Sequence, residues 1–348
     1  DNKKGVPMFN FRNDYHDLCH PNVLKALAAT DGEGNAGYGF DAHTERAAQL
    51  IRDAAGGDYP VHVVHGGTAA NVLALTFHLR PHEAIVSADT GHVVEHEVGA
   101  IEAAGHKVVS VKTEAGKYDA EDLDEFLSSF GDFHNVLPGI IYLSNTTETG
   151  LVYRKEELAA IRKVADKYRL PVYIDGARMA SALTSEFNDV KLSEYMDYAD
   201  MFSVGGTKNG ALFGEALVFK NEELVREFIY FQKQRALLMA KGFTLGAQYE
   251  ALFTDDLFFE NGRAANRAAS YLARELTWLG VEFIYPPESN QLFIRLPKAA
   301  ADGLEKHGQF DIMGPKEDGT VPVRFVTDYN TTKDEIDGAI KVLEGLLK

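Results

Sequence analysis

One lysine, Lys208, has the sequence surroundings of a reactive amine. It follows Met201–Val204, a short apolar run that predicts a buried strand, and a Gly-Gly pair that predicts a tight turn. The run Glu215–Lys220 predicts the next strand. Burial between two strands disfavours a charged ammonium, and a neutral amine attacks carbonyls and forms Schiff bases. The same pattern also fits a solvated lysine on a loop.

A carboxylate, Asp175, stands at the end of another predicted strand. The apolar run Val172–Ile174 precedes it, and Gly176 turns the chain toward a helix. Open parallel α/β sheets bind ligands outside the carboxyl ends of their strands, where Asp175 and Lys208 both fall. A carboxylate that keeps a pyridine nitrogen protonated and a Schiff-base lysine are together the basic requirement of a pyridoxal phosphate (PLP) site. The alternative is that Asp175 only caps the helix that follows it.

A third segment suits a phosphate group. The predicted strand Val61–His65 runs through Gly66 and Gly67 into a helix that we expect Thr68 to cap. Free N–H groups at a helix N-terminus bind anions, and glycines permit close approach. Many turns of this kind use Gly and Thr for capping alone, so both interpretations stay open.

The histidines and the cysteine give little support for a metal site. His92 and His96 are four residues apart and can share a helix face, but no third ligand stands out, so we expect no metal and interpret them as surface or stacking histidines. Cys19 is the only cysteine, which excludes an internal disulfide and a cysteine-rich metal site. We expect it to be an inert packed thiol.

The composition limits the possible partners. The 348 residues are 45% hydrophobic, enough for one large core or two unequal domains, and the formal net charge is −17. Such a charge argues against nucleic acid and against anionic membranes as partners. No apolar run approaches the roughly 20 residues that span a bilayer, and the first residues lack the apolar stretch of a signal peptide. We therefore expect a cytoplasmic protein.

The order of the predicted elements indicates an α/β fold. Strands alternate with helices from about Val61 to Phe219, which is typical of a mostly parallel sheet covered on both faces, and Thr44 is expected to cap an amphipathic helix. Neither a Gly-x-Gly-x-x-Gly motif after the first strand nor a P-loop is present, which counts against a dinucleotide or ATP fold.

After Asn221 the pattern changes. Long helices are predicted over about Glu222–Leu252 and Leu257–Leu279, followed by three short strands and a final helix from Thr332, which together indicate a smaller α+β domain. We therefore expect three parts: an N-terminal arm with a helix and loop over 1–43, a large α/β domain over 44–245, and a small C-terminal domain over 246–348.

Taken together, these motifs resemble the threonine aldolase family of fold-type-I PLP enzymes, which have the aspartate-aminotransferase-like architecture. The similarity runs almost from end to end through HPNVLKAL, GYGFD, GGTAAN, SNTTETGLVY, IDGAR, GGTKNG and VRFV. The IDGAR and GGTKNG stretches are its most specific parts. The resemblance implies a mostly parallel central sheet and a smaller C-terminal α+β domain.

The resemblance also assigns roles to individual residues. Lys208 would bind PLP as a Schiff base, and Asp175 would pair with the pyridine nitrogen. His92 would stack on the ring, Arg178 would lie beside the phenolic oxygen and near the substrate, and the phosphate would be held by Gly66, Gly67 and Thr68. Asn13, where many relatives carry serine, and Arg324 would bind the substrate carboxylate, Arg324 by a bidentate pair.

Two departures from the family pattern concern the base and the phosphate. Where some members carry a histidine near the substrate hydroxyl, this sequence has Thr147. The first candidate for the base is then His92, with His16 and Glu97 in reserve.

Where many members carry an arginine that reaches the phosphate, this sequence has Phe243, so Arg235 or Lys241 is the candidate for that charge.

The resemblance implies retro-aldol cleavage of a threonine-like β-hydroxy-α-amino acid to glycine and an aldehyde, in a homodimer or homotetramer. A β-eliminating lyase or an aminotransferase could use the same lysine and aspartate, because the reaction depends on which Cα bond is held perpendicular to the ring. A non-catalytic PLP-binding protein is the third possibility. The sequence leaves open the side chain accepted and the configuration at Cα and Cβ.

Overall fold

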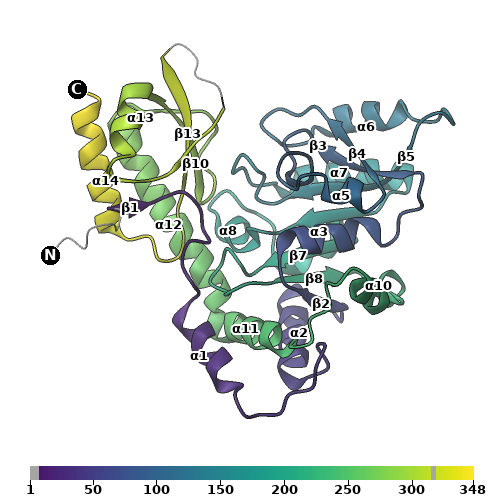
Figure 1. The fold of residues 1–348 in the computed structure, drawn as a ribbon. Helices are drawn as coiled ribbons and strands as arrows, with labels where there is room; N and C mark the ends of the chain where they lie inside the picture. Colours follow the sequence, from purple (N-terminus) through teal and green to yellow (C-terminus); the bar gives the residue numbers. More distant parts are fainter. Residues whose placement is uncertain (1–7, 315–318) are drawn as a thin grey trace.

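A seven-stranded sheet is the largest sheet of the protein (Figure 1). The computed structural model describes residues 8–314 and 319–348. The strands of this sheet are β2 (Val61–Val64), β3 (Glu83–Ala88), β4 (Lys107–Val111), β5 (Leu137–Ser144), β6 (Val172–Asp175), β7 (Met201–Gly205) and β8 (Glu215–Phe219). They lie in the order β2-β8-β7-β6-β5-β3-β4. Strand β8 is antiparallel to both of its neighbours, and the other pairs are parallel. The predicted mostly parallel sheet is confirmed.

Helices cover both faces of this sheet. Along β6, Val172 and Ile174 pack into one hydrophobic cluster and Tyr173 into another, as the alternation of side chains on a strand requires. The first cluster includes side chains of α1 (Pro21–Ala29), α2 (Ala42–Ala55), α6 (Ala120–Ser128), α7 (Lys155–Tyr168), α8 (Met179–Thr184), η1 (Leu192–Glu194), α9 (Tyr195–Tyr198), α11 (Phe243–Phe253) and α12 (Leu257–Trp278). The second includes side chains of α3 (Gly67–Thr76), α4 (His92–Glu95), α5 (Ala100–Ala103) and α10 (Phe228–Gln234).

A separate core surrounds a four-stranded antiparallel sheet. Its strands are β9 (Glu282–Phe283), β10 (Gln291–Pro297), β12 (Asp311–Ile312) and β13 (Thr320–Val326), in the order β12-β13-β10-β9, and its helices are α13 (Lys298–Leu304) and α14 (Lys333–Leu346). The N-terminal arm joins this core: β1 (Phe9–Asn10) pairs with β11 (Gly308–Gln309), and Phe9 and Phe11 are buried in the cluster. The domain boundaries after residues 43 and 245 stay predictions, and residues 1–7 lie outside the described part of the arm.

Helix α12 connects the two cores. Phe258 near its start packs in the core of the large sheet, whereas Leu272 and Leu276 near its end pack in the core of the small one. Figure 1 shows it running between the two groups of elements. The helix predicted over Leu257–Leu279 is thereby confirmed. Within the described residues, no helix combines the length and the apolar character that crossing a membrane requires.

The long helix predicted over Glu222–Leu252 is wrong. The chain forms the 3₁₀ turn η2 (Glu222–Val225), then α10, then α11. Glu227 takes a left-handed φ of 66°, which interrupts helical geometry before α10. Ala236, with a left-handed φ of 60°, interrupts it again after α10. Gly242 then lies so close to the earlier loop that a Cβ there would be 2.6 Å from the backbone nitrogen of Gly39. The break lets the segment before α11 pack closely against the glycine-rich loop.

The cap of α2 also differs from the prediction. Asp41, not Thr44, precedes the first helical residue, and its carboxylate accepts from both Thr44 N and Thr44 Oγ1, each at 2.8 Å. An aspartate at this position pairs an anion with free N–H groups, which favours it over a hydroxyl three residues later.

Two glycines let the ends of β6 and β7 approach one another. A Cβ at Gly176 would lie 2.0 Å from the carbonyl oxygen of Ser203, and one at Gly205 would lie 2.3 Å from that of Ala177. In the absence of these carbons, Gly205 N donates to Gly176 O at 2.9 Å. The contact places the end of β6 beside the loop that follows β7.

We expect Gly176→Ala to destabilise the protein, because the added carbon meets backbone that cannot rotate away. Overpacking of this kind typically costs about 1–3 kcal/mol. Chemical denaturation gives the free energy of unfolding, with Gly345→Ala as the matched control. Gly345 lies in α14 with no atom within 4 Å of an added Cβ, so this variant should lose no stability. Equal stability of Gly176→Ala and the parent would contradict the close approach.

Candidate active site

A cavity of about 390 Å³ opens at the carboxyl ends of β6 and β7. Six of the nine predicted site residues line it: Gly66, Gly67, Thr68, His92, Asp175 and Lys208. Arg178, Asn13 and Arg324 do not. Segments far apart in the chain therefore converge where ligands of α/β sheets bind.

Asp175 is the last residue of β6 and is only 5% exposed. One carboxylate oxygen accepts from Ala177 N at 2.9 Å, and the other accepts from Asn71 Nδ2 at 3.0 Å and Tyr142 OH at 2.8 Å. Helix α8 begins only at Met179, so a capping role explains one of these three bonds at most. The three donors fix the carboxylate in one orientation at the cavity wall.

Lys208 lies on the loop between β7 and β8, with its side chain at the cavity. The neighbouring Thr207 stabilises this loop, since its hydroxyl accepts from Gly214 N at 3.0 Å. Among residues 8–314 and 319–348, the Lys208 ammonium group has no hydrogen-bond partner and no ion pair within 4.0 Å. The Lys208 side chain is half-buried.

The N-terminus of α3 forms one end of the cavity. Its N-cap is Gly66, and no side chain of the described residues caps it, so the first N–H groups of the helix are left without a side-chain partner there. A Cβ at Gly66 or Gly67 would meet no atom within 4 Å, which leaves open space beside these groups. Thr68 is the second helical residue and not the cap that we predicted. The arrangement suits an anion.

His92 is oriented by buried hydrogen bonds. Its Nδ1 lies 2.9 Å from Glu97 Oε1, which also accepts from Asn71 Nδ2 at 2.8 Å. Burial by itself would lower the pKa of His92, but the bond to Glu97 and the charges of Glu148 and Asp175 outweigh it and raise the pKa. Because Nδ1 faces a carboxylate, Nε2 is the nitrogen that remains for a ligand.

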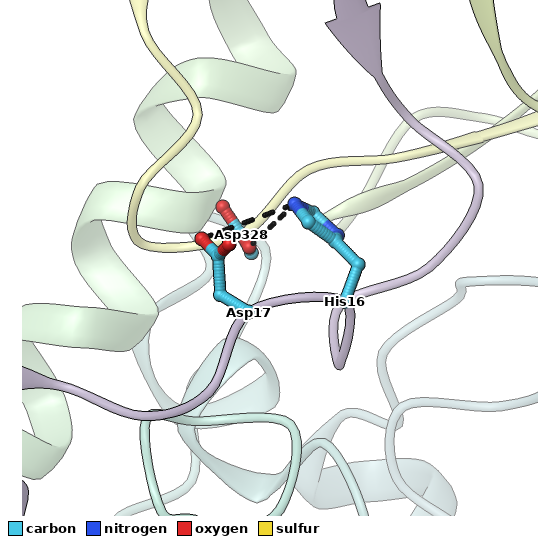
Figure 2. Close-up of side chains that lie close together, drawn as sticks. All are labelled: His16, Asp17 and Asp328. Atoms are coloured by element: carbon cyan, nitrogen blue, oxygen red, sulfur yellow. Dashed lines mark ion pairs between the residues drawn. The ribbon is translucent and has the colours of Figure 1, made fainter. Parts of the chain in front are cut away.

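Of the two reserve bases, Glu97 is buried and bonded to His92, and His16 is not among the residues that line the cavity. Figure 2 shows His16 directed toward Asp17 and Asp328: its Nε2 is 3.6 Å from Asp328 Oδ2 and 4.0 Å from Asp17 Oδ2. In the described part of the chain, these three residues are the one group whose ligand atoms lie close enough together to hold a metal. Each also has another protein partner: Asn13 O for His16, Asn330 for Asp17 and Thr331 for Asp328. The group joins the arm to the loop after β13.

Arg178 is held just beside the cavity by Asp14. Its Nε and Nη2 donate to the two Asp14 oxygens at 2.7 and 3.1 Å, and Asn290 Nδ2 adds a third bond to Asp14 at 3.0 Å. Burial would raise the pKa of Asp14, but the charges of Arg178 and Lys208 outweigh it and hold the pKa below its usual value. The pair anchors the arm to the large sheet.

Asn13 and Arg324 lie apart from Lys208. The Asn13 side chain accepts from the backbone N–H of Tyr15 at 3.1 Å. Arg324 lines a neighbouring cavity of about 360 Å³ that shares His96 with the first, and its Nη2 donates to Asp311 at 2.5 Å. Their role in binding a substrate carboxylate stays a prediction.

Thr147 is directed into its own loop. Its hydroxyl lies 2.8 Å from Thr149 Oγ1 and accepts from Leu151 N at 3.0 Å. Its side chain is therefore occupied within the protein and does not line the cavity.

Neither candidate for the missing phosphate charge lines the cavity. Arg235 lies over the Phe231 ring, 4.9 Å from its centre, and donates to Ala104 O at 3.4 Å. Lys241 is exposed, and Phe243 begins α11. Within the described chain, Lys208 is the only lysine or arginine among the lining residues.

The structure adds lining residues that the sequence did not single out: Tyr15, His65, Asn71, Phe213 and Glu215. Asn71 could have been found, since it stands four residues after Gly67 on one helix face. Glu215 is a carboxyl group at the start of an otherwise apolar buried strand, which is itself a signal.

The topology places the protein in the aspartate-aminotransferase-like, fold-type-I class. Aspartate aminotransferase from Thermus thermophilus shares this fold with a TM-score of 0.73 at 18% identity, over 98% of this chain and 92% of that one.

The family follows from three comparisons. The family model described as Beta-eliminating lyase matches residues 12–299. A low specificity L-threonine aldolase from Pseudomonas aeruginosa is 31% identical over 299 residues, 85% of this chain and 86% of its own. A solved threonine aldolase structure from Leishmania major has a TM-score of 0.96 at 39% identity, over 98% of this chain and 100% of that one. The chain belongs to the β-eliminating lyase family and, within it, to the threonine aldolases.

We expect Asp14→Asn to lower stability strongly, because it leaves the Arg178 guanidinium buried without its counter-charge. Breaking a buried pair typically costs about 3–5 kcal/mol. Since the pKa of Asp14 is lowered in the folded state, this stabilisation is present at neutral pH and is lost as the pH falls through the folded-state pKa. Denaturation at pH 7 and pH 3 measures both effects. The exposed Asp31→Asn is the control, and an equal loss in both variants would contradict the role of the pair.

Proposed function

We propose that the protein is a PLP-dependent aldolase that cleaves a threonine-like β-hydroxy-α-amino acid to glycine and an aldehyde. The observation that carries the proposal is the shared cavity of Lys208, Asp175 and the uncapped N-terminus of α3, in a chain 39% identical to a threonine aldolase of known structure. β-Elimination and transamination need the same lysine and aspartate, so they are the alternatives.

The residues present fit PLP. Gly66, Gly67 and Thr68 would hold its phosphate beside the uncapped helix, Asp175 would face the pyridine nitrogen, and Lys208 would bind the aldehyde. When bound, PLP takes up the electrons of the broken Cα–Cβ bond. A phosphate bound at the start of α3 requires open space, and Gly66 and Gly67 leave such space beside the helix.

His92 is the proposed base for the β-hydroxyl proton. Glu97 holds Nδ1, which leaves Nε2 to accept a proton at the cavity, and Thr147 is turned away. Arg178, Asn13 and Arg324 would orient the substrate through its carboxylate, a task that favours cleavage of one Cα bond over the others.

We further propose that copies of the chain assemble as a homodimer or homotetramer in the cytoplasm. In support, the glycine-rich loop exposes Phe40 at 72% and Tyr38 at 42%, and the arm exposes Leu18 and Tyr15. Apolar side chains on extended segments suit contacts with a second copy. Light scattering on purified protein measures the mass.

The function is tested by its products. With PLP, we expect L-threonine, L-allo-threonine or phenylserine to yield glycine. We expect no ammonia from serine and no keto acid from any of these four amino acids. Borohydride should fix the cofactor on Lys208, and Lys208→Ala should abolish both labelling and turnover, because none of the other described lining residues is a lysine. Release of ammonia or keto acid in place of glycine would favour one of the alternatives.

The pH profile tests His92 as the base. A base must be neutral, and the pKa of His92 is raised, so kcat should fall as the pH drops through a value above about 6.5. Glu97→Gln removes the main group that raises this pKa, and the acidic limb should then move to lower pH. Glu95→Gln is the control: Glu95 lies on α4 with His92 but is exposed, so this variant should leave the pH profile unchanged.

His92→Phe keeps a ring and removes the proton acceptor. We expect near-normal PLP binding and a loss of kcat of roughly 10²–10⁴, the usual contribution of a general base. A kcat and pH profile equal to the parent's would exclude His92 as the base.

A further inference from the structure

One carboxyl group in the cavity, Glu215, has no part in the chemistry described so far. It is the first residue of β8 and is 3% exposed. It lies opposite Val64 of β2 and Gly205 of β7. These two strands lead directly to the Gly66 turn and to the Lys208 loop. Glu215 therefore lies between the anion-binding end of the cavity and the reactive amine.

Glu215 lacks the partners that a buried carboxylate needs. Its Oε2 is buried with no hydrogen-bond partner in the described chain, and no ion pair joins it to Lys208 within 4.0 Å. An isolated buried carboxylate is strongly disfavoured, so such a group is neutral unless a ligand compensates it. A neutral carboxylic acid has one O–H donor to offer.

Lysine and arginine offer little positive charge to a phosphate in this cavity. Lys208 is its only lysine or arginine in the part of the chain that the structure describes, and that amine is committed to the aldehyde of PLP under the proposed function, on which this inference rests. Arg235, Lys241 and Phe243 are not among its lining residues. An ionised Glu215 would repel a phosphate dianion, whereas a protonated one would donate to it.

We propose that Glu215 is a phosphate ligand: it stays protonated and donates its O–H to an oxygen of the bound phosphate monoester. The hydrogen bond supplements the N–H groups at the start of α3. A neutral donor thus takes the place of a second lysine or arginine, since Lys208 is the only one among the described lining residues.

The surroundings of Glu215 agree with a neutral acid. Burial raises its pKa to about 8; Lys208 and the Thr207 hydroxyl oppose the shift, and Asp175 adds to it. Other titratable groups that face it are Tyr173 on β6, Tyr249 on α11, and His65 and His92 across the cavity. The two tyrosines are buried and uncharged at neutral pH, because burial raises the pKa of each well above its usual value.

The proposal is tested by anion binding without turnover. Pyridoxine 5′-phosphate carries the phosphate but no aldehyde, so it cannot react with Lys208, and sulfate stays a dianion across the whole pH range. Affinities for both are measured by calorimetry on the full-length apo-protein from pH 6 to 10. In the parent, we expect binding to weaken about tenfold or more between pH 7 and 9.5, because Glu215 must then take up a proton to bind the anion.

Glu215→Gln is the decisive variant, since its amide is a donor of the same shape that never ionises. We expect affinity within about threefold of the parent at pH 7 and little loss at pH 9.5. Glu215→Ala removes the donor and should bind about tenfold or more weakly at pH 7. Glu222→Gln, on the exposed 3₁₀ turn, should behave as the parent. Near-UV circular dichroism shows whether each variant is folded, and the Gln variant decides the question if the Ala variant is not.

Three results would overturn the proposal: the same pH dependence in Glu215→Gln and the parent, tighter anion binding by Glu215→Gln at pH 7, or no anion binding by the parent. The second would mean that Glu215 is an ionised partner of Lys208. Because no amino acid is present, the outcome is independent of the reaction type. A protein that binds these anions as expected but forms no glycine from β-hydroxy amino acids would refute the proposed function alone.

Discussion

Burial of several carboxylates around one cavity is the constraint on which the site depends. Asp14, Glu97, Asp175 and Glu215 are all buried near Lys208, and each requires compensation because an isolated buried charge is costly. Arg178 pairs with Asp14, His92 with Glu97, and three hydrogen-bond donors with Asp175. Glu215 differs from the other three, because its pKa is raised and a bound proton removes its negative charge. Four carboxyl groups in one region are thus compensated in four different ways.

The strand ends make this distribution possible. Asp175 and the Lys208 loop follow adjacent parallel strands, and the glycines at the ends of β6 and β7 remove the side chains that would hold them apart. Asn71 on α3 connects two of the carboxylates, since its amide donates to both Glu97 and Asp175. The helix whose N-terminus is proposed to bind the phosphate therefore also holds Asp175 and, through Glu97, the proposed base His92.

Local patterns in the sequence predict most of the fold and part of the site. Strand and turn signals located Gly66, Asp175 and Lys208, because each stands at the end of a contiguous apolar strand or in the turn directly after it. The long helix after Asn221 could not be excluded, because its breaks fall at Glu227 and Ala236, two residue types that are common in helices but here take a left-handed φ. The Asp14–Arg178 pair joins residues 164 positions apart. The position of Glu215 at the cavity depends on its pairing with the strands on either side. Contacts between residues so far apart in the chain produce no periodic pattern in the sequence.

The residues with proposed roles at the site are divided between the two hydrophobic cores. Lys208 and Asp175 belong to the large sheet, whereas Arg324 lies on β13 of the small one, and the arm that carries Asn13 is packed into the small core through Phe9 and Phe11. The groups proposed to bind the cofactor and those proposed to orient the substrate carboxylate therefore rest on separate hydrophobic cores, connected by α12 and by the Asp14–Arg178 pair. Because lysine and aspartate alone permit several reactions, the choice of bond must come from the orienting groups. Reaction specificity in this chain then depends on how the small core is held against the large sheet.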